Sequence, residues 1–203
     1  MAGLQTEPDT GLGEVGSHEL ARRAQSGCAV SFEELARRYR PRLLTVLERR
    51  LSGNISDAED VAQEALSRAW QKIGLYDDKY QFSTWLYTIA FRIATDHHRR
   101  DRRRKHDVGL GSGSEPVDPA QFERTVQRKE EANNLWAVAH AVLNEAQYTV
   151  LWLRYGEDLE VKEVARATGR TAVGTRVLLH RARKLLQQHV VPKPMNDKPG
   201  GAS

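Results

Sequence analysis

The sequence predicts an all-α chain of two small helical domains joined by a flexible acidic linker. Apolar residues recur at three- and four-residue steps, the spacing of one helix face, and no alternation typical of strands occurs. Glycines, serines and prolines are concentrated in VGLGSGSEPVDP (108–119), which interrupts the helical pattern. The 203 residues suffice for two small domains.

Domain boundaries follow from where this helical patterning starts and stops. Residues 1–17 lack periodicity and carry acidic residues without a Lys or Arg, which predicts a disordered leader. We expect one helical domain at 18–106, the linker at 107–125 and a second helical domain at 126–189. The Pro- and Gly-rich tail, 190–203, is also expected to be disordered.

Several residues predict where helices begin, bend or end. Pro41 lies inside the first long apolar stripe and should kink or interrupt it. Ser56 and Glu59 have capping-box spacing after a Gly-Asn turn, and Ser83 can cap a further helix. In the second domain Asn144 can cap a helix, and two short helices are expected at roughly 161–168 and 171–187.

The distribution of charge is more informative than the net charge of +4. Residues 99–105 read RRDRRRK, and residues 170–184 carry five basic residues and no acid. Between these blocks, residues 107–123 carry acids and no base. Two basic blocks on either side of an acidic link suggest two contacts with a polyanion, although either block alone could be a solvated helix face.

Residues 161–180 have the layout of a helix-turn-helix. Ala165 is small where the two helices would approach, Gly169 tolerates a positive φ in the turn, and Val164 and Leu178 would bury the inner faces. The second helix would then lie in the major groove of DNA. The candidates for base or phosphate contacts are Arg170, Thr171, Ala172, Thr175 and Arg176, with Arg181, Arg183 and Lys184 on the DNA backbone. A plain helical hairpin is the alternative.

Two features of the first domain also call for an explanation. Asp60, Gln63 and Glu64 fall on one side of a predicted helix, as either a docking surface for a partner's helices or a merely solubilising face. Six aromatic residues lie between 76 and 91 and are followed by basic residues. Aromatic faces stack unpaired bases at about 1–3 kcal/mol per base, so this segment could bind melted DNA. Trp85 is expected to be largely core, which favours Tyr76, Tyr80 and Phe82 for the bases.

Other classes of site are not indicated. No apolar run is long enough to span a membrane, and no secretory signal is visible. Cys28 is the single cysteine, which excludes an intrachain disulfide and a multi-cysteine zinc site and fits a reducing cytoplasm. The histidines form no metal-ligand pattern, and no phosphate loop or nucleophile elbow occurs. We therefore expect no metal, cofactor or catalytic residue.

The residues resemble a known family over about 20–105 and 130–188. FEELARRYRPRLLTVLERRL (32–51), DAEDVAQEALSRAW (57–70) and FSTWLYTIAFRIATDHHRR (82–100) resemble region 2 of group 4, extracytoplasmic-function (ECF) sigma factors of the sigma-70 family. LNEAQYTVLWLRY (143–155) and the ending LLHRARKLL (178–186) resemble sigma region 4. Val173-Gly174-Thr175 can be aligned with the Gly-Thr-Val pattern of the family either directly or with a shift of one residue. The individual base contacts of this helix could therefore move by one position.

This resemblance implies a promoter-recognition factor for core RNA polymerase. Region 2 would bind the clamp helices of the β′ subunit through Asp57, Asp60, Val61, Gln63, Glu64 and Arg68. It would capture flipped minus-10 bases through Tyr76, Tyr80, Phe82 and Trp85 and hold adjacent DNA through Arg92, Asp96, His97, Arg99 and Arg100. Region 4 would read the minus-35 element and touch the β flap. The linker would thread toward the active-site channel, and an anti-sigma factor is an expected partner.

Three other classes remain as alternatives. A helix-turn-helix regulator that acts without polymerase would leave the aromatic segment and residues 57–70 unexplained. A helical adaptor that binds only protein would make the basic blocks solvated faces. An enzyme is the least supported class, since no catalytic motif is present.

Overall fold

The computed structural model of this chain describes residues 12–107 and 130–190, with the side chains of 12–100 and 135–189. Every regular element in these ranges is helical, which confirms the predicted all-α class. The expected linker at 107–125 lies outside the described residues except for Asp107, the last residue of the long helix before it, as do most of the expected leader and nearly all of the expected tail.

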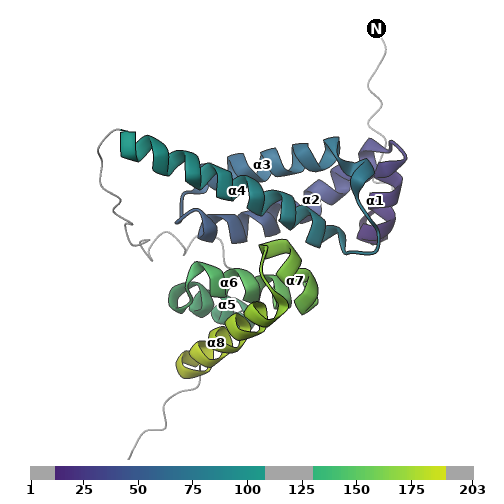
Figure 1. The fold of residues 1–203 in the computed structure, drawn as a ribbon. Coiled ribbons are helices and arrows are strands. Elements are labelled where there is room, and N and C mark those ends of the chain that lie inside the picture. Colours follow the sequence, from purple (N-terminus) through teal and green to yellow (C-terminus); the bar gives the residue numbers. More distant parts are fainter. Residues whose placement is uncertain (1–11, 108–129, 191–203) are drawn as a thin grey trace, which may run out of the picture.

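The N-terminal body is a bundle of four helices (Figure 1). Its elements are η1 (Leu12–Glu14), α1 (Ser17–Gln25), α2 (Ala29–Arg50), α3 (Ile55–Gln71), η2 (Ile73–Leu75) and α4 (Phe82–Asp107). The core forms where α1, α3 and α4 pack on α2, around fully buried leucines such as Leu20, Leu43 and Leu86. This packing buries the apolar stripes that the sequence shows at helical spacing.

Four local expectations about this body are wrong. Residues 12–17 are ordered, because the Arg38 guanidinium donates to the carbonyls of Leu12 and Val15 at 2.5 and 2.7 Å. Helix α2 continues through the solvent-exposed Pro41, so the expected interruption is wrong, whereas the alternative, a kink at Pro41, stays a prediction. The cap of α3 is Asn54, whose side chain accepts from the Asp57 amide, in place of Ser56. Ser83 lies inside α4, which begins at Phe82.

The C-terminal body is a second, smaller helical unit. Its elements are α5 (Glu130–Val142), α6 (Glu145–Leu151), the π-helical turn η4 (Trp152–Gly156), α7 (Val161–Thr168) and α8 (Ala172–Val190). Asn144 caps α6 as expected, in a reciprocal capping box with Gln147. The two short helices expected near 161–168 and 171–187 are α7 and α8.

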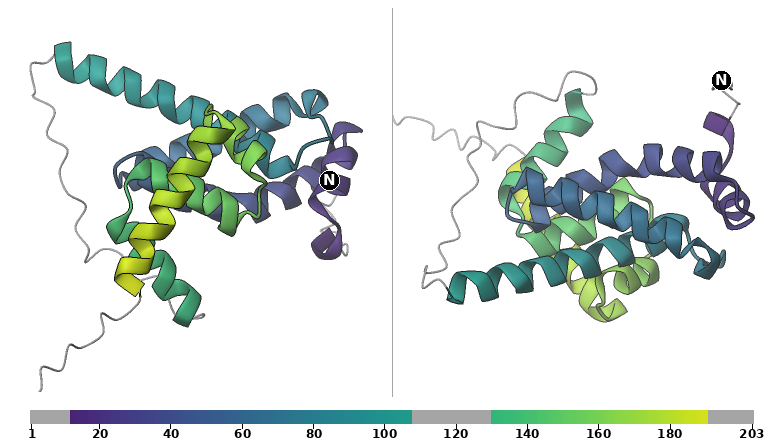
Figure 2. Two further views of the ribbon diagram at one scale, coloured as in Figure 1. Left: turned by 60° about the horizontal axis from the view of Figure 1, so that its bottom comes forward. Right: turned by 90° about the horizontal axis from the view of Figure 1, so that it is seen from above.

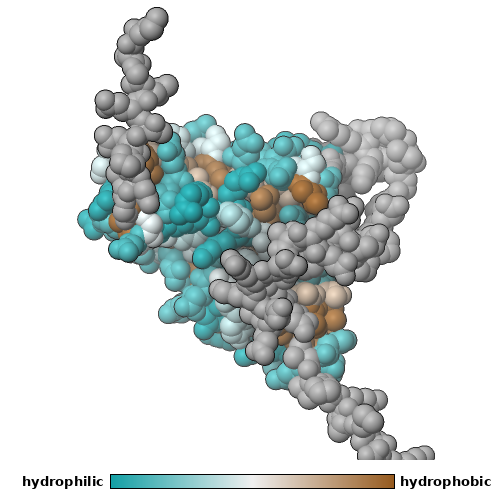
Figure 3. Space-filling model, turned by 180° about the vertical axis from the view of Figure 1, so that it is seen from behind, coloured by the Kyte–Doolittle hydropathy of each residue, from teal (hydrophilic) through white to brown (hydrophobic). Residues whose placement is uncertain are grey.

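The two bodies pack directly against each other, α7 on α4 and α6 on α2 (Figures 1 and 2). Arg50 of α2 forms an ion pair with Glu145 of α6 at 2.7 Å, which fixes one end of the contact. The face seen in Figure 3 is mostly hydrophilic, with small separate hydrophobic areas. No described helix is long and apolar enough to cross a bilayer.

Candidate nucleic-acid interface

The segment predicted as a helix-turn-helix folds as one in α7 and α8. Gly169 adopts φ +67°, a left-handed conformation that favours glycine, and the Arg170 amide donates back to the Ala165 carbonyl at 2.9 Å. The Thr171 hydroxyl then accepts from the Gly174 amide at 3.1 Å, which caps the first turn of α8. The roles expected for Gly169, Ala165 and Val164 are confirmed, the latter two being buried. Leu178 is only half-buried, and its neighbour Leu179 takes the inner position.

One predicted reader of DNA on α8 cannot reach it. Thr175 is fully buried, and its hydroxyl donates to the Thr171 carbonyl at 3.0 Å, so its assignment to base contacts is wrong. Ala172 is half-buried at the start of the helix. The other predicted contacts are exposed: Arg170, Thr171, Arg176, Arg181, Arg183 and Lys184. The expected basic surface of α8 is therefore present, but Thr175 is not part of it.

The aromatic segment before and within α4 is divided between core and surface. Tyr76 and Phe82 are only 5% and 1% exposed, and their rings pack edge to face 5.7 Å apart. The Tyr76 hydroxyl donates to the Tyr80 carbonyl at 2.7 Å, and burial raises its pKa well above the ordinary value. The assignment of Tyr76 and Phe82 to base capture is therefore wrong for this conformation. Tyr80 and Trp85 are half-exposed.

Helix α7 covers the exposed part of this aromatic segment. The Arg166 Nη2 donates to the Tyr80 hydroxyl at 2.7 Å, and its guanidinium carbon lies 3.7 Å from the Tyr80 ring centroid. The Glu163 carboxylate accepts from the Gln81 amide at 3.2 Å and from the Thr84 hydroxyl at 3.1 Å. The first helix of the helix-turn-helix thus covers the Tyr80 ring and holds the segment from Gln81 to Thr84.

A buried carboxylate holds the same two bodies together further along α4. Glu157, just after η4, accepts from the Tyr87 hydroxyl at 3.0 Å and pairs with Arg42 of α2 at 3.3 Å. The Trp152 indole N–H donates to the Tyr87 hydroxyl at 3.4 Å. Burial raises the pKa of Glu157, and the Arg42 charge only partly opposes this rise. Glu157 therefore connects the end of η4 to both α2 and α4 across the interface between the two bodies.

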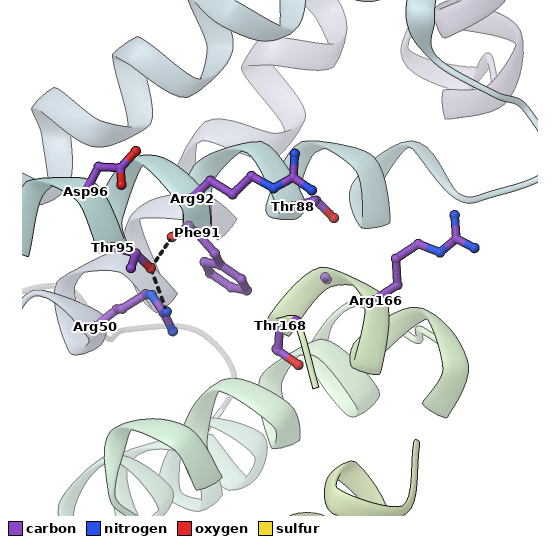
Figure 4. Close-up of a pocket in the computed structure, with 10 residues that line it drawn as sticks. Arg50, Thr88, Phe91, Arg92, Thr95, Asp96, Arg166 and Thr168 are labelled. Carbon is purple, nitrogen blue, oxygen red and sulfur yellow. Dashed lines mark hydrogen bonds between the residues drawn. The ribbon is translucent and has the colours of Figure 1, made fainter. Parts of the chain in front are cut away.

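A cleft of about 360 Å³ lies between α4 and the turn that ends α7 (Figure 4). Arg50, Arg92 and Arg166 reach its rim from α2, α4 and α7, and Asp96 lies on the same wall as Arg92. Thr95 in this wall donates to the Phe91 carbonyl at 2.7 Å. Beyond the cleft the basic surface of α4 continues through three further predicted DNA contacts, His97, Arg99 and Arg100.

The polar face of α3 forms a separate shallow groove of about 510 Å³. Asp60 and Gln63 are exposed on its wall, and Glu64 pairs with Arg68 at 2.5 Å. The common side inferred from the spacing of Asp60, Gln63 and Glu64 is thus real. Val61 is 1% exposed and points into the core, so its assignment to a partner contact is wrong. Asp57 is half-exposed and lies 3.8 Å from the His97 imidazole.

Several residues at these surfaces were not found by sequence reasoning. Glu163 and Arg166 are ordinary helix-surface residues by pattern and Glu157 lies just past a helix end, and only the packing of the two bodies brings them to Thr84, Tyr80 and Tyr87. Val173 and Val177 on α8 could have been found, since they are apolar at positions opposite the buried residues of that helix. Among the described residues, no group of three or more His, Cys, Asp or Glu side chains is placed to hold a metal.

Comparison with known proteins places these two bodies in one family. Residues 35–104 match sigma-70 region 2, and residues 135–186 match sigma-70 region 4. The ECF RNA polymerase sigma factor RpoE of Cereibacter sphaeroides is 31% identical, over 79% of this chain and 86% of its own length. SigG of Mycobacterium tuberculosis is 33% identical over 68% of this chain. The matched segment spans only 43% of the length of SigG. SigW of Bacillus subtilis is 27% identical over 83% of this chain and 94% of its own length.

Solved structures show the same fold at lower identity. CnrH, in complex with the cytosolic domain of CnrY, is 20% identical, with a TM-score of 0.55 over 86% of this chain and 96% of that one. RpoE of Bartonella quintana, in complex with the anti-sigma factor NepR, is 22% identical, with a TM-score of 0.58 over 80% and 98%. The chain belongs to the extracytoplasmic-function group of the sigma-70 family.

Proposed function

We propose that this chain is a transcription initiation factor that binds core RNA polymerase, recognises minus-35 and minus-10 promoter elements and helps to melt promoter DNA. The observation that carries the proposal is the presence, in family order, of regions 2 and 4, each with an exposed basic helix. Bond making belongs to the polymerase, so the chain itself needs no catalytic residue. Its place of action is the cytoplasm, where promoters are transcribed.

In this proposal region 4, the body within 126–189, binds duplex DNA through α8. Arg170 approaches the groove, while Arg176, Arg181, Arg183 and Lys184 contact phosphates. Phosphate contacts release counterions, so the affinity for DNA should fall steeply as salt rises. The β flap of polymerase is the proposed protein contact of this region.

Region 2, the body within 18–106, captures an unstacked base of the minus-10 element. Once α7 has moved off Tyr80, Tyr80 and Trp85 offer the aromatic faces, and Arg92, Asp96, His97, Arg99 and Arg100 of α4 hold the adjacent DNA. Removing a base from the stack costs a few kcal/mol, and stacking on an aromatic ring returns a comparable amount. Binding energy is thereby converted into strand opening.

The groove on α3 is the proposed docking site for the β′ clamp helices. Asp60 and Gln63 are exposed there without a core role, and the Glu64–Arg68 pair borders them. Asp57 lies at the start of the same helix. A face with both charge signs and an amide suits docking onto charged helices better than it suits an apolar partner.

The contact between the two bodies supports low DNA affinity of the free chain. Tyr80, which would stack on a base, is already occupied by Arg166, and Glu163 holds the segment from Gln81 to Thr84. Polymerase binding would separate the bodies and set the distance between the two DNA-reading surfaces, with the linker at 107–125 threaded toward the active-site channel. An anti-sigma factor is a proposed partner, as NepR is for the Bartonella relative.

Run-off transcription of genomic DNA with core polymerase tests this function directly. We expect defined start sites that require the chain, and their absence would overturn the proposal. Binding of duplex DNA by the chain without polymerase would instead favour a helix-turn-helix regulator. If the chain shows no salt-sensitive binding to DNA, a helical adaptor that binds only protein is favoured.

Docking is tested by pull-down with core polymerase. The Asp60→Ala, Gln63→Ala double variant should bind core enzyme at least tenfold more weakly, which corresponds to about 1.4 kcal/mol. Glu59→Ala is the matched control, because Glu59 is an exposed carboxylate of the same helix outside the groove. Equal retention of the double variant and the control would reject the α3 groove as the docking site.

A further inference from the structure

The outward face of α8 carries two large apolar side chains that the fold does not use. Val173 is 67% exposed and Val177 is 44% exposed, and they lie one helical turn apart. Most apolar residues of this body are buried, so an exposed pair on one turn is unusual here.

Their position on the helix is defined by the residues that are buried. Thr175, Leu179, Ala182 and Leu186 form the inner stripe of α8. At about 100° per residue, Val173 and Val177 lie on the side opposite that stripe. Arg176 and Arg181 are exposed on the two edges between the valines and the core. The pair thus forms the centre of a cationic face on the first turns of α8, the helix that extends away from the four-helix body toward its C-terminal end (Figure 1).

This arrangement matches the chemistry of one base edge. In the major groove the C5-methyl group of thymine is the apolar feature, whereas the other groups on base edges are hydrogen-bond donors and acceptors. Residues near the N-terminus of a recognition helix contact the bases, and Val173 is the second residue of α8. Arginines on both edges would meet the two phosphate backbones that border the groove.

We propose that Val173 and Val177 read thymine methyl groups in the duplex element bound by region 4. The proposal rests on the proposed promoter-binding function and deepens it by naming the specificity-determining side chains. The valines contribute apolar contacts to the bases, and Arg176 and Arg181 hold the phosphates on either side. Thr175, which the sequence suggested as a reader, instead stabilises the inner face.

The test compares thymine with deoxyuridine, which lacks only the C5-methyl group. The probe is a duplex that carries the upstream element of a promoter mapped by run-off transcription, with its thymines replaced one at a time and together. Its affinity for holoenzyme assembled from core polymerase and the full chain is measured at fixed salt. We expect about a fourfold loss for each methyl group contacted, the equivalent of one buried CH₂.

The variants separate methyl reading from general DNA binding. Val173→Ala and Val177→Ala should bind the thymine probe several-fold more weakly and should lose the discrimination against deoxyuridine. Arg181→Ala should weaken binding of both probes equally and reduce the salt dependence, while discrimination stays intact. Both valines are exposed, so thermal unfolding of the variants should match that of the parent chain.

The outcomes distinguish this inference from the proposed function. Promoter binding by holoenzyme with equal affinity for thymine and deoxyuridine would overturn the inference alone. Failure of holoenzyme to bind any mapped promoter would overturn both. Valine variants that keep full discrimination but associate weakly with core polymerase would assign the pair to protein docking, and methyl reading would be rejected.

Discussion

Replacing Arg166 by alanine should release the aromatic segment of region 2 in the free chain. The guanidinium stacks 3.7 Å from the Tyr80 ring centroid, a contact worth about 0.5–1 kcal/mol at an exposed site. It also donates to the Tyr80 hydroxyl at 2.7 Å, which adds about 0.5–1 kcal/mol after solvent screening. The variant therefore weakens the contact between α7 and Tyr80 by about 1–2 kcal/mol. This changes the ratio of the closed state, in which α7 covers Tyr80, to the open state, in which Tyr80 is free, by a factor of roughly 5–30.

The assay is fluorescence anisotropy of the full free chain with a single-stranded oligonucleotide of the mapped minus-10 non-template sequence. Because apparent affinity scales with the fraction of competent molecules, Arg166→Ala should bind up to about 5–30 times more tightly than the parent chain. Lys162→Ala removes the same charge from an exposed position of α7 and should weaken binding slightly. Affinities for Arg166→Ala equal to or below those of Lys162→Ala would show that α7 does not mask Tyr80.

Three further outcomes are expected. Burial raises the pKa of Glu157 above its usual 4.5, so the folded state is favoured while this carboxyl is protonated and loses that stability as pH rises through the raised pKa. Glu157→Gln should remove this part of the pH dependence of the unfolding free energy, and an unchanged dependence would contradict the assignment. Gly169→Ala should cost about 1–2 kcal/mol at φ +67°, seen as a lower Tm by calorimetry. Leu43→Ala, at a fully buried position, should cost about 2–5 kcal/mol in urea unfolding.

Local signals predicted much of the C-terminal body. Asn144 was expected as a helix cap and forms a capping box, since capping depends on residues three positions apart. Gly169 was expected in the turn and has the positive φ that the turn requires. At the start of α3 the local signal was misleading, because the expected capping box at Ser56 is absent and Asn54, two residues earlier, caps the helix.

Other predictions failed because burial is a property of the whole body. Tyr76 and Phe82 lie in or beside a loop in sequence, but Tyr76 contacts His18 of α1 and Phe82 packs against rings of α2, so both side chains are buried. Val61 lies next to Asp60 in sequence, yet at helical spacing it falls on the opposite, core-facing side. Adjacent residues of one motif therefore do not share one role.

By itself the sequence determined the all-α class, the two bodies, the basic surfaces and the family, because these depend on periodicity, composition and motif order. Only the tertiary structure decided that Arg166 covers Tyr80, that Glu157 joins Tyr87 and Arg42, and that Val173 and Val177 face outward from α8. The physical reason is that the contacts of Arg166 and Glu157 join residues 70 to 115 positions apart along the chain, and the exposure of a side chain depends on everything that packs nearby.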